Sequence, residues 1–293
     1  MTLPTEASPA GSVGRRPTPS ARSRRSGRLG LLGLLGLHTL SELRASARTV
    51  EYVIVAVTLP ALLFAMFGLP SADETNVLGD GTHVGTMMMV SMCCYGIVSL
   101  AIFTFGEQVA KDRASGWVRT MRATPLPGWS HLTAKLELGL IAAVLVIAST
   151  GGLAVALGNV RLDLAQWVGL VAVLLAGLVA FAPFGFAIAF AVRPRAASAI
   201  VNLIFLPLAF LSGFFVPLAE LPAVLGDVAV WLPTYHFGQL AWSQVASASG
   251  VEAWVASAPQ AVWVHVTWVL GATVVFSVLA VLAARRAGVA GRG

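Results

Sequence analysis

Residues 164–192 read LAQWVGLVAVLLAGLVAFAPFGFAIAFAV, a stretch that contains no Asp, Glu, Lys or Arg. A helix needs about 20 mainly apolar residues to cross the hydrocarbon core of a bilayer. This stretch is longer, so a helix here can tilt or extend past the core. Pro183 is compatible with a spanning helix, because neighbouring helices and water can satisfy the carbonyl that the proline frees. The stretch therefore predicts a transmembrane helix.

The composition of the whole chain fits the same class. Of its 293 residues, 57% are hydrophobic and 11% are charged, against roughly 25% charged in ordinary globular proteins. The mean hydropathy is +0.82, and a soluble fold of this composition would expose larger apolar patches than soluble monomers carry. We therefore predict an all-α polytopic membrane protein. The net charge of +6 does not indicate nucleic-acid binding, because membrane proteins use arginine to set their orientation.

Five further stretches have the length and apolarity of a spanning helix. Pro60 and Pro207 lie inside two of them, and we expect both to be tolerated for the reason given for Pro183. The predicted transmembrane domain covers 50–284. Its six spans lie at about 50–69, 84–106, 136–158, 164–192, 196–217 and 261–284.

Lysine and arginine are distributed very unequally between the two sides of these spans. Arg161 is the one basic residue on one side, and the other 18 of the 19 lysines and arginines lie on the opposite side. Cytoplasmic loops of membrane proteins carry the excess of basic residues. The sequence therefore predicts a multi-pass protein of the cell membrane with both termini in the cytoplasm, including a short tail at 285–293.

The N-terminal segment has two parts. Residues 1–28 are rich in Pro, Ser, Gly and Arg and are expected to be a disordered basic tail. The following apolar run imitates a signal peptide, but using it as a span would place the basic loop 107–135 outside. We instead predict an amphipathic helix over 29–49 that lies in the inner membrane interface before the first span.

Catalytic and nucleotide-binding motifs are not found in the sequence. The phosphate-binding pattern G-x-x-x-x-G-K-[ST] needs a glycine before its lysine, whereas Lys111 and Lys135 both follow alanine. The five histidines are scattered without metal-ligand spacing, and the adjacent Cys93 and Cys94 are interpreted as small packing residues. We expect that the chain is not an enzyme and binds no cofactor. If ATP drives it, ATP and Mg²⁺ bind to a separate ATPase.

The interiors of the predicted spans are almost free of ionisable side chains. A charge at mid-bilayer costs roughly 2.5–3.5 kcal/mol on insertion scales, so ion-coupled carriers keep such groups only where coupling requires them. This pattern disfavours a proton-coupled carrier and favours an apolar or amphipathic cargo. Thioethers and aromatic rings suit variable hydrophobic cargo. The alternative is ordinary packing or, for the amide of Asn202, a hydrogen bond between helices. The candidate cargo residues are Met87, Met88, Asn202, Phe205, Phe210 and Phe214.

The loop between the second and third predicted spans carries the most specific pattern. Residues 107–135 read EQVAKDRASGWVRTMRATPLPGWSHLTAK. Gly116 can end the helix that emerges from span two, and residues 117–123 can then form a short helix with Trp117 on its apolar side. That helix stops at Thr124, because the residue before a proline is pushed out of the helical region. Such a helix can fit a groove on a cytosolic partner, or it can lie on lipid headgroups.

This loop resembles the cytoplasmic loop of ABC type-2 (ABC-2) permeases, and more narrowly that of the daunorubicin-resistance and multidrug export permeases. In those proteins an acidic-Arg-x-x-Gly turn leads into a coupling helix, and a Pro-Leu turn and a lysine follow. Ala134, before that lysine, replaces a frequent glycine. A second match is LSGFFVPLAELP at 211–222, which resembles the signature before the family's short re-entrant helices. The family's positions are occupied here by Asp112, Arg113, Gly116, Trp117, Pro125, Leu126 and Lys135. The resemblance implies that the loop contacts the ATPase, and we expect the contact to be made by these residues except Lys135, together with Arg119, Met121 and Arg122 of the short helix.

The resemblance covers about residues 35–285 and implies the permease subunit of an ATP-driven exporter of a drug, an antibiotic or a lipid-like molecule. It implies a homodimer, or a pair with a second permease, and separate ATPase subunits. Two other classes stay open, namely a six-span secondary carrier and a non-transporting membrane anchor for a cytosolic partner. Vanadate-sensitive ATP hydrolysis that cargo stimulates would separate the exporter from both.

Overall fold

The computed structural model describes residues 50–73, 75–116 and 130–290, and only the backbone at 50–54, 130–131 and 287–290. Within these ranges the chain is helical, and β structure is limited to one bridge between Val77 and His83. The predicted tail at 1–28, the predicted interface helix at 29–49 and the predicted coupling helix at 117–123 lie outside the described residues.

The first half of the chain forms two long helical rods with interruptions in their backbone pattern. The first rod is α2, which passes through a π-helical turn and a 3₁₀ turn before the loop at 72–83. The second rod is α3, which continues through another π-helical turn into α4. The bounds are α2 Val50–Leu63, η2 Phe64–Gly68, η3 Leu69–Ser71, α3 Val84–Ile102, η4 Phe103–Gln108 and α4 Val109–Ala114.

The second half contains four long helices and a group of short ones. Pro183 lies inside α7, Pro207 inside α8 and Pro60 inside α2. The three prolines are therefore accommodated in helices, as predicted. The bounds are α6 Ser130–Leu157, α7 Leu164–Ala191, η5 Pro194–Ala196, α8 Ala197–Leu211, η6 Leu218–Glu220, α9 Ala223–Ala229, α10 Pro233–Trp242, α11 Ala248–Val255 and α12 Val262–Ala290.

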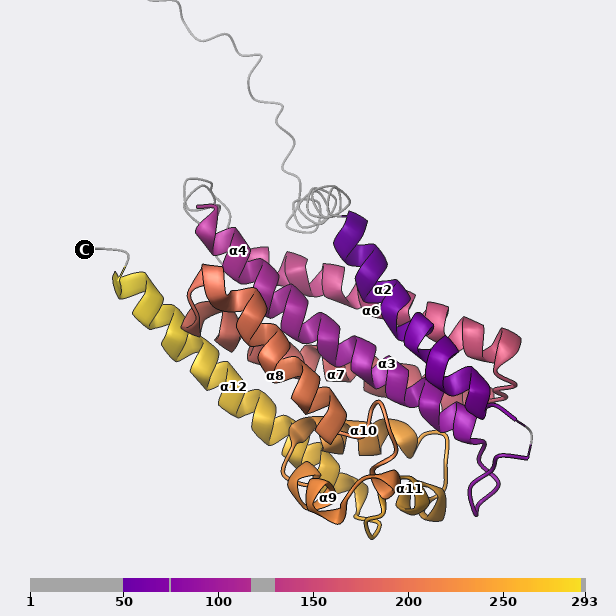
Figure 1. The fold of residues 1–293 in the computed structure, drawn as a ribbon. Coiled ribbons are helices and arrows are strands. Elements are labelled where there is room, and N and C mark those ends of the chain that lie inside the picture. The colour runs from indigo at the N-terminus through magenta and orange to yellow at the C-terminus, as the bar shows by residue number, and fades with distance from the viewer. Residues whose placement is uncertain (1–49, 74, 117–129, 291–293) are drawn as a thin grey trace, which may run out of the picture.

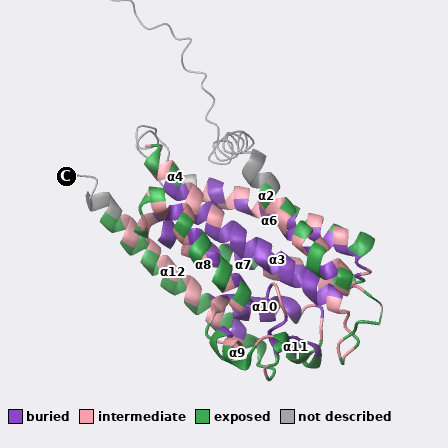
Figure 2. Ribbon diagram, in the orientation of Figure 1, coloured by how far each residue is buried: buried purple, intermediate pink, exposed green. Residues whose placement is uncertain are grey.

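The α3 helix lies at the centre of the bundle. In its most apolar window 89% of the residues are buried, against 11% for the equivalent window of α12 (Figure 2). It packs against α2, α6 and α7, while α12 packs along α7 at the side of the bundle (Figure 1). A helix that is apolar all round belongs in such a central position. The exposed apolar residues of α12 form a surface suited to lipid.

Five described helical segments are long and apolar enough to cross a membrane, whereas six were predicted. The first predicted span is represented by a shorter apolar helix, Val55–Ser71. The fifth ends at Leu211 instead of 217, since Ser212 and Gly213 turn the chain and Gly213 has a φ of +76°. The last helix runs to Ala290, so the predicted tail at 285–293 is helical over its first part.

The two ends of the bundle differ in charge. We call one end, which holds α4, η5 and the C-terminal part of α12, the basic end, because Lys111, Arg113, Arg193, Arg195 and Arg285 lie there. Arg161 lies between α6 and α7 at the other end, which also holds α9, α10 and α11 (Figure 1). We call this the α10 end. The gathering of basic residues at one end agrees with the charge pattern of the sequence.

The α10 end is closed by aromatic rings and neutral hydrogen bonds. Trp242, Trp254 and Tyr235 are almost completely buried, and Trp242 donates a hydrogen bond from Nε1 to the hydroxyl of Ser91 in α3 at 3.0 Å. The short helices η6, α9, α10 and α11 lie between α8 and α12. Their re-entry into the membrane stays a prediction.

Candidate functional site

The helix that emerges from α3 at the basic end continues without a break to Ala114. Gly116 then adopts a φ of +76°, and its N–H donates to the carbonyl of Arg113, while that of Ser115 donates to Lys111. A left-handed glycine after the last helical turn is a common helix terminator, and glycine has no Cβ to oppose it. The prediction that Gly116 ends this helix is confirmed.

Asp112 of α4 forms an ion pair that crosses to α6. Its Oδ2 lies 3.1 Å from Nζ of Lys135, whose side chain is 6% exposed. Asp112 itself is 29% exposed, so the ammonium group is the buried partner. A buried charge is costly unless it is paired. The pair therefore ties the end of the α3 rod to the start of α6.

Arg113 connects the same rod to α7. Its guanidinium donates a hydrogen bond to the carbonyl of Ala189, and its Cζ lies 5.0 Å from the centre of the Phe190 ring. An arginine within about 6 Å of an aromatic face is in cation–π range. Asp112 and Arg113, adjacent in sequence, thus anchor α4 to two different helices.

Glu107 completes the connections at this end. It lies in the π-helical turn η4, and its Oε1 accepts a hydrogen bond from the hydroxyl of Ser198 in α8 and lies 2.6 Å from Nζ of Lys111. We call the side chains of Glu107, Lys111, Asp112, Arg113, Lys135 and Ser198 the basic-end network. Through it, the end of the α3 rod contacts α6, α7 and α8.

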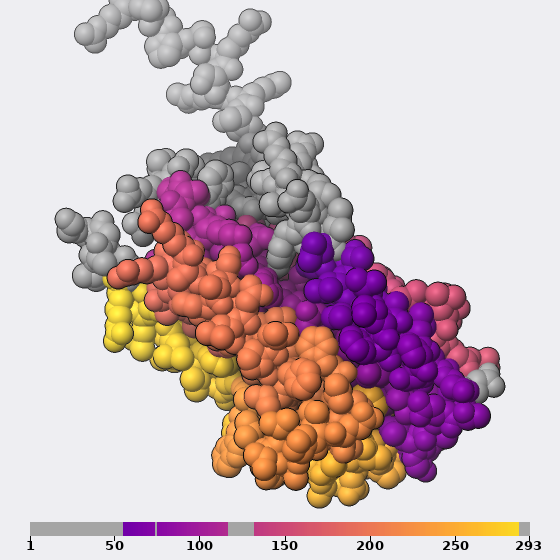
Figure 3. Space-filling model, viewed as in Figure 1, coloured from indigo at the N-terminus to yellow at the C-terminus, as the bar shows by residue number. Residues whose placement is uncertain are grey.

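A cavity of about 420 Å³ lies between α2, α3 and α8, and α2 (indigo) and α8 (orange) border each other on the face shown in Figure 3. Its wall on α3 is formed by residues spaced four apart, which lie on one face of a helix. Glu107 is the charged residue among those that line it. We call it the α2–α3–α8 cavity; its lining is Val55, Ala56, Leu59, Pro60, Tyr95, Ser99, Phe103, Glu107, Asn202, Phe205 and Leu206.

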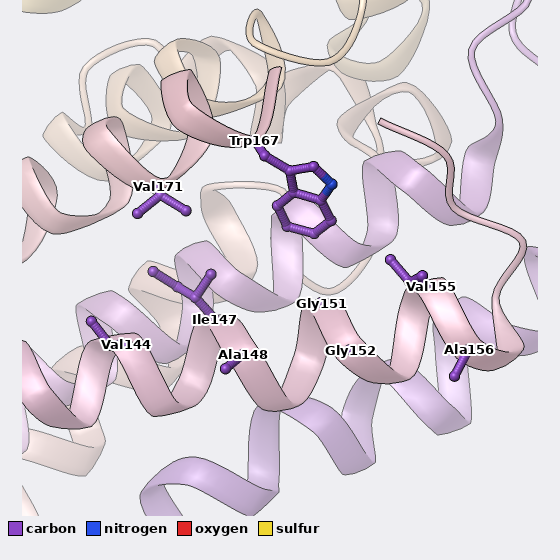
Figure 4. Close-up of a pocket in the computed structure, with 9 residues that line it drawn as sticks. All are labelled: Val144, Ile147, Ala148, Gly151, Gly152, Val155, Ala156, Trp167 and Val171. Atoms are coloured by element: carbon purple, nitrogen blue, oxygen red, sulfur yellow. The ribbon is translucent and has the colours of Figure 1, made fainter. Parts of the chain in front are cut away.

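A second, larger hollow lies between α6 and α7 and has a volume of about 510 Å³. Trp167 extends from α7 toward Gly151 of α6 (Figure 4), where a Cβ would lie 2.9 Å from the indole ring. The described residues that line this hollow carry neither an ionisable group nor a hydroxyl. The one polar side-chain group among them is the indole N–H of Trp167, so the hollow offers a charged cargo group no counter-charge, unlike the α2–α3–α8 cavity.

The family described as "ABC-2 family transporter protein" matches residues 41–282, which is most of the chain. The chain belongs to the ABC-2 transporter family. It is also similar to "Putative transport permease YvfS" of Bacillus subtilis (strain 168), with 25% identity over 211 residues that cover 72% of this chain and 85% of the relative.

This ABC-2 protein is therefore a multi-pass membrane protein of a transport family whose members generally work as permeases without enzymatic activity and pair with an ATPase subunit. Three of the residues predicted to face the ATPase, Asp112, Arg113 and Gly116, lie together at the basic end. The other six lie outside the described residues, namely Trp117, Arg119, Met121, Arg122, Pro125 and Leu126.

The structure divides the predicted cargo residues of this ABC-2 protein. Phe205 and Asn202 line the α2–α3–α8 cavity, and the Asn202 amide donates to the carbonyl of Ser198 in its own helix at 2.8 Å. Phe210 is 42% exposed, and its ring centre is 6.0 Å from that of Phe215. The other three, Met87, Met88 and Phe214, are buried in packing away from the cavity.

Sequence reasoning missed several residues that the structure brings together. Tyr95, Ser99, Phe103 and Glu107 recur every four residues along one helix, a spacing that could have marked them as one face. The partnership of Glu107 with Ser198, 91 positions away, has no comparable signal. It depends on how α3 and α8 pack.

Proposed function

We propose that this chain is the permease subunit of an ATP-driven exporter that moves an amphipathic molecule out across the cell membrane. In this proposal the ATP and Mg²⁺ sites lie on a separate ATPase, and a second permease, identical or related, completes the complex. The basic end faces the cytoplasm. The narrower resemblance to daunorubicin-resistance and multidrug permeases stays a prediction.

The observation that carries the proposal is the position of Glu107. It belongs both to the basic-end network and to the wall of the α2–α3–α8 cavity. A force applied at α4 is therefore applied, through one helix, to the cavity wall. The rod from Val84 to Ala114 has 31 residues, about 46 Å at 1.5 Å per residue, so it spans the roughly 30 Å hydrocarbon core and extends beyond it.

The proposed mechanism has two states. When the ATPase subunits close on ATP, the segment that follows Gly116 moves with them and displaces α4. The basic-end network transmits this displacement to α6, α7 and α8, and the cavity opens toward the α10 end. A cargo that binds one state more tightly is carried with the change, because a ligand can only shift an equilibrium by its differential affinity.

Single substitutions in the segment after Gly116 test this function. The tagged chain is purified together with its ATPase, and the ATPase recovered is measured for wild type, Trp117→Ala, Val118→Pro and the control Ser115→Ala. Buried aromatic residues at interfaces often contribute 2 kcal/mol or more, and a proline breaks a short helix. We expect both changes at 117 and 118 to reduce recovery at least tenfold, with normal membrane insertion.

Two further results bear on the same proposal. Arg119→Ala should have the smaller effect, growing at high salt, because charges at the rim of an interface mainly alter association rate and salt dependence. Amphipathic compounds should stimulate vanadate-sensitive ATP hydrolysis by the wild-type complex. Wild-type recovery of the ATPase in both Trp117→Ala and Val118→Pro would refute the docking role, and unstimulated hydrolysis would favour a carrier or a membrane anchor.

A further inference from the structure

The α2–α3–α8 cavity has a polar end and an apolar end. Along α3 its wall runs from Tyr95 through Ser99 and Phe103 to Glu107, a rise of roughly 18 Å over twelve residues. The Glu107 carboxylate lies at the basic end of this wall, where it forms an ion pair with Lys111. The rest of the lining is mostly aliphatic and aromatic. Such a gradient suits a molecule with a charged head and an apolar body.

Among the described residues, the carboxylate of Glu107 is contacted through one of its two oxygens. Both of its contacts, to Lys111 and Ser198, are made by Oε1, so Oε2 has no hydrogen-bond partner among the described residues. The Glu107 side chain is 15% exposed, while that of Lys111 is 62% exposed. Solvent-exposed ion pairs contribute little, about 0–1 kcal/mol. Replacing the lysine ammonium by another cation therefore costs little.

Aromatic rings surround the path to this carboxylate. Phe103 and Phe205 meet edge to face with ring centres 5.5 Å apart, and the Tyr95 ring centre is 5.1 Å from that of Phe205. All three rings line the cavity. Aromatic faces attract cations, and the attraction increases when water is excluded. The rings and the carboxylate therefore both favour a positively charged ligand.

We propose that the α2–α3–α8 cavity binds amphipathic cations, with Glu107 as the residue that selects for positive charge and the rings of Tyr95, Phe103 and Phe205 as the apolar part of the site. This rests on the proposed transport function and names its cargo class. The cargo cation takes the place of the Lys111 ammonium beside Glu107. A neutral amphiphile of the same shape gains the apolar contacts alone, and an anion is repelled.

Two probes of the same shape and opposite charge test the proposal. Tetraphenylphosphonium and tetraphenylborate are each titrated by equilibrium dialysis against the purified full-length chain in lipid nanodiscs without ATPase. We expect the cation to bind about tenfold more tightly than the anion, a ratio that the Coulomb attraction of one carboxylate can supply, after subtraction of binding to empty nanodiscs.

Four variants locate the selectivity. Glu107→Gln keeps an acceptor for Ser198 and should remove the tenfold preference, while Glu107→Asp should retain it. Lys111→Gln removes the competing ammonium and should tighten cation binding about two- to threefold. The control Glu220→Gln removes an exposed carboxylate near the α10 end and should change nothing. Retention of the full preference by Glu107→Gln, or no saturable cation binding by wild type, would overturn the proposal.

The outcome is separable from that of the transport proposal, because the titration involves no ATP and no partner. Cation-selective binding without any response of the ATPase would leave the site standing and refute ATP-driven export. Stimulation of the ATPase by neutral amphiphiles, with equal binding of the two probes, would refute the cation site and leave export standing.

Discussion

The basic end and the α10 end of the bundle are held together by different chemistry. At the basic end, α4 is attached by charged contacts such as Asp112 with Lys135 and Arg113 with Phe190. At the α10 end the contacts are mostly neutral and enclosed by buried rings such as Trp242, with the Asp80 carboxylate, which accepts from Ser247, as the charged exception. Packed rings resist small displacements, whereas the pair of Glu107 with the exposed Lys111 can exchange partners at little cost. Motion is therefore expected to enter at the basic end.

Histidines illustrate the neutral character of the α10 end. Nε2 of His236 lies 3.0 Å from the carbonyl oxygen of Val230, and its Nδ1 lies 2.8 Å from Nδ1 of His265. Since a carbonyl only accepts, His236 donates from Nε2, and in its neutral form its Nδ1 accepts from His265. The pair fixes α10 to α12 without any formal charge.

The largest expected effect comes from adding a methyl group at Gly185, where α7 packs closely against α3. A Cβ on Gly185 would lie 2.4 Å from the carbonyl oxygen of Ala101, which is backbone and cannot rotate away. Gly185→Ala should destabilise the protein by about 3 kcal/mol, in the range of overpacked cores, as measured by the thermal midpoint in detergent. At Gly177 the atom met is on the Phe237 ring, and Gly177→Ala should cost less.

The matched control is Gly152→Ala, where a Cβ would meet nothing within 4 Å. Its midpoint should equal or exceed that of wild type, since alanine is the better helix former. Equal midpoints for all three variants would contradict the close approach of α3 and α7 and, with it, the rigid rod that the mechanism requires.

A smaller loss is expected from Asp112→Asn, which leaves the buried Lys135 ammonium without its counter-charge. Removal of one partner of a buried ion pair is strongly destabilising, and because Asp112 is 29% exposed we expect about 2 kcal/mol. Adding Lys135→Met should restore most of this stability. Denaturation midpoints of the four proteins in the cycle give the coupling, and strictly additive losses would show that the pair contributes nothing.

Cysteine labelling tests which end of the bundle faces the cytoplasm. We expect a cysteine at one end to be fully modified in intact cells and a cysteine at the other end to be unmodified. Glu252→Cys lies on an exposed position of α11 and should react with an impermeant thiol reagent in intact cells. Ser115→Cys, exposed at the basic end, should react only after permeabilisation. Native Cys93 and Cys94 are 1% and 0% exposed, so they add little background. The reverse pattern would invert the predicted orientation.

Asp80 gives the smallest predicted effect and belongs to the α10 end. Burial raises its pKa, but hydrogen bonds from Thr82 and Ser247 outweigh this and lower it from 3.8 to about 2. A carboxyl with a depressed pKa stabilises the fold above its unfolded pKa, and this stabilisation is lost as the pH falls from about 4 toward 2. Exchange of the Ser247 amide hydrogen should therefore accelerate over that interval, beyond its intrinsic pH dependence.

Asp80→Asn is the control for this titration. It should remove the additional pH dependence, because the amide does not ionise in this range. If wild type and Asp80→Asn show the same pH profile, the carboxylate does not hold the loop at 72–83 against α11, and the α10 end is less tightly closed than the contacts indicate.

Much of the fold could be predicted because apolar runs of this length have few alternatives in a membrane. The same reasoning located Gly116, since a glycine after a helix has a local meaning. The end of α8 was placed too late although Gly213, with a φ of +76°, gives the same local signal as Gly116, and the contact of the Ser212 hydroxyl with Thr234 at 2.5 Å joins residues 22 positions apart. Sequence periodicity carries no record of such partners.

The candidate site was predicted in part for a similar reason. Asp112 and Arg113 were recognised from the pattern in the loop, but their partners on α6 and α7 were not. His236 and His265 were treated as scattered, yet they meet across 29 positions. Met87 and Met88 were assigned to the cargo path from their chemistry, and the structure places them in the packed centre of the bundle.

The basic-end network, and not the α10 end, is expected to transmit the action of the ATPase to the cavity. This is tested by comparing two carboxylates in the reconstituted complex, Asp112→Asn at the basic end and Asp80→Asn at the α10 end. Vanadate-sensitive ATP hydrolysis is measured with and without tetraphenylphosphonium and a neutral amphiphile.

We predict that Asp112→Asn retains the ATPase but loses stimulation about tenfold, because α4 is no longer fixed to α6, and that Asp80→Asn is stimulated as wild type is. Full stimulation of Asp112→Asn, or an equal loss in both variants, would contradict transmission through the basic-end network.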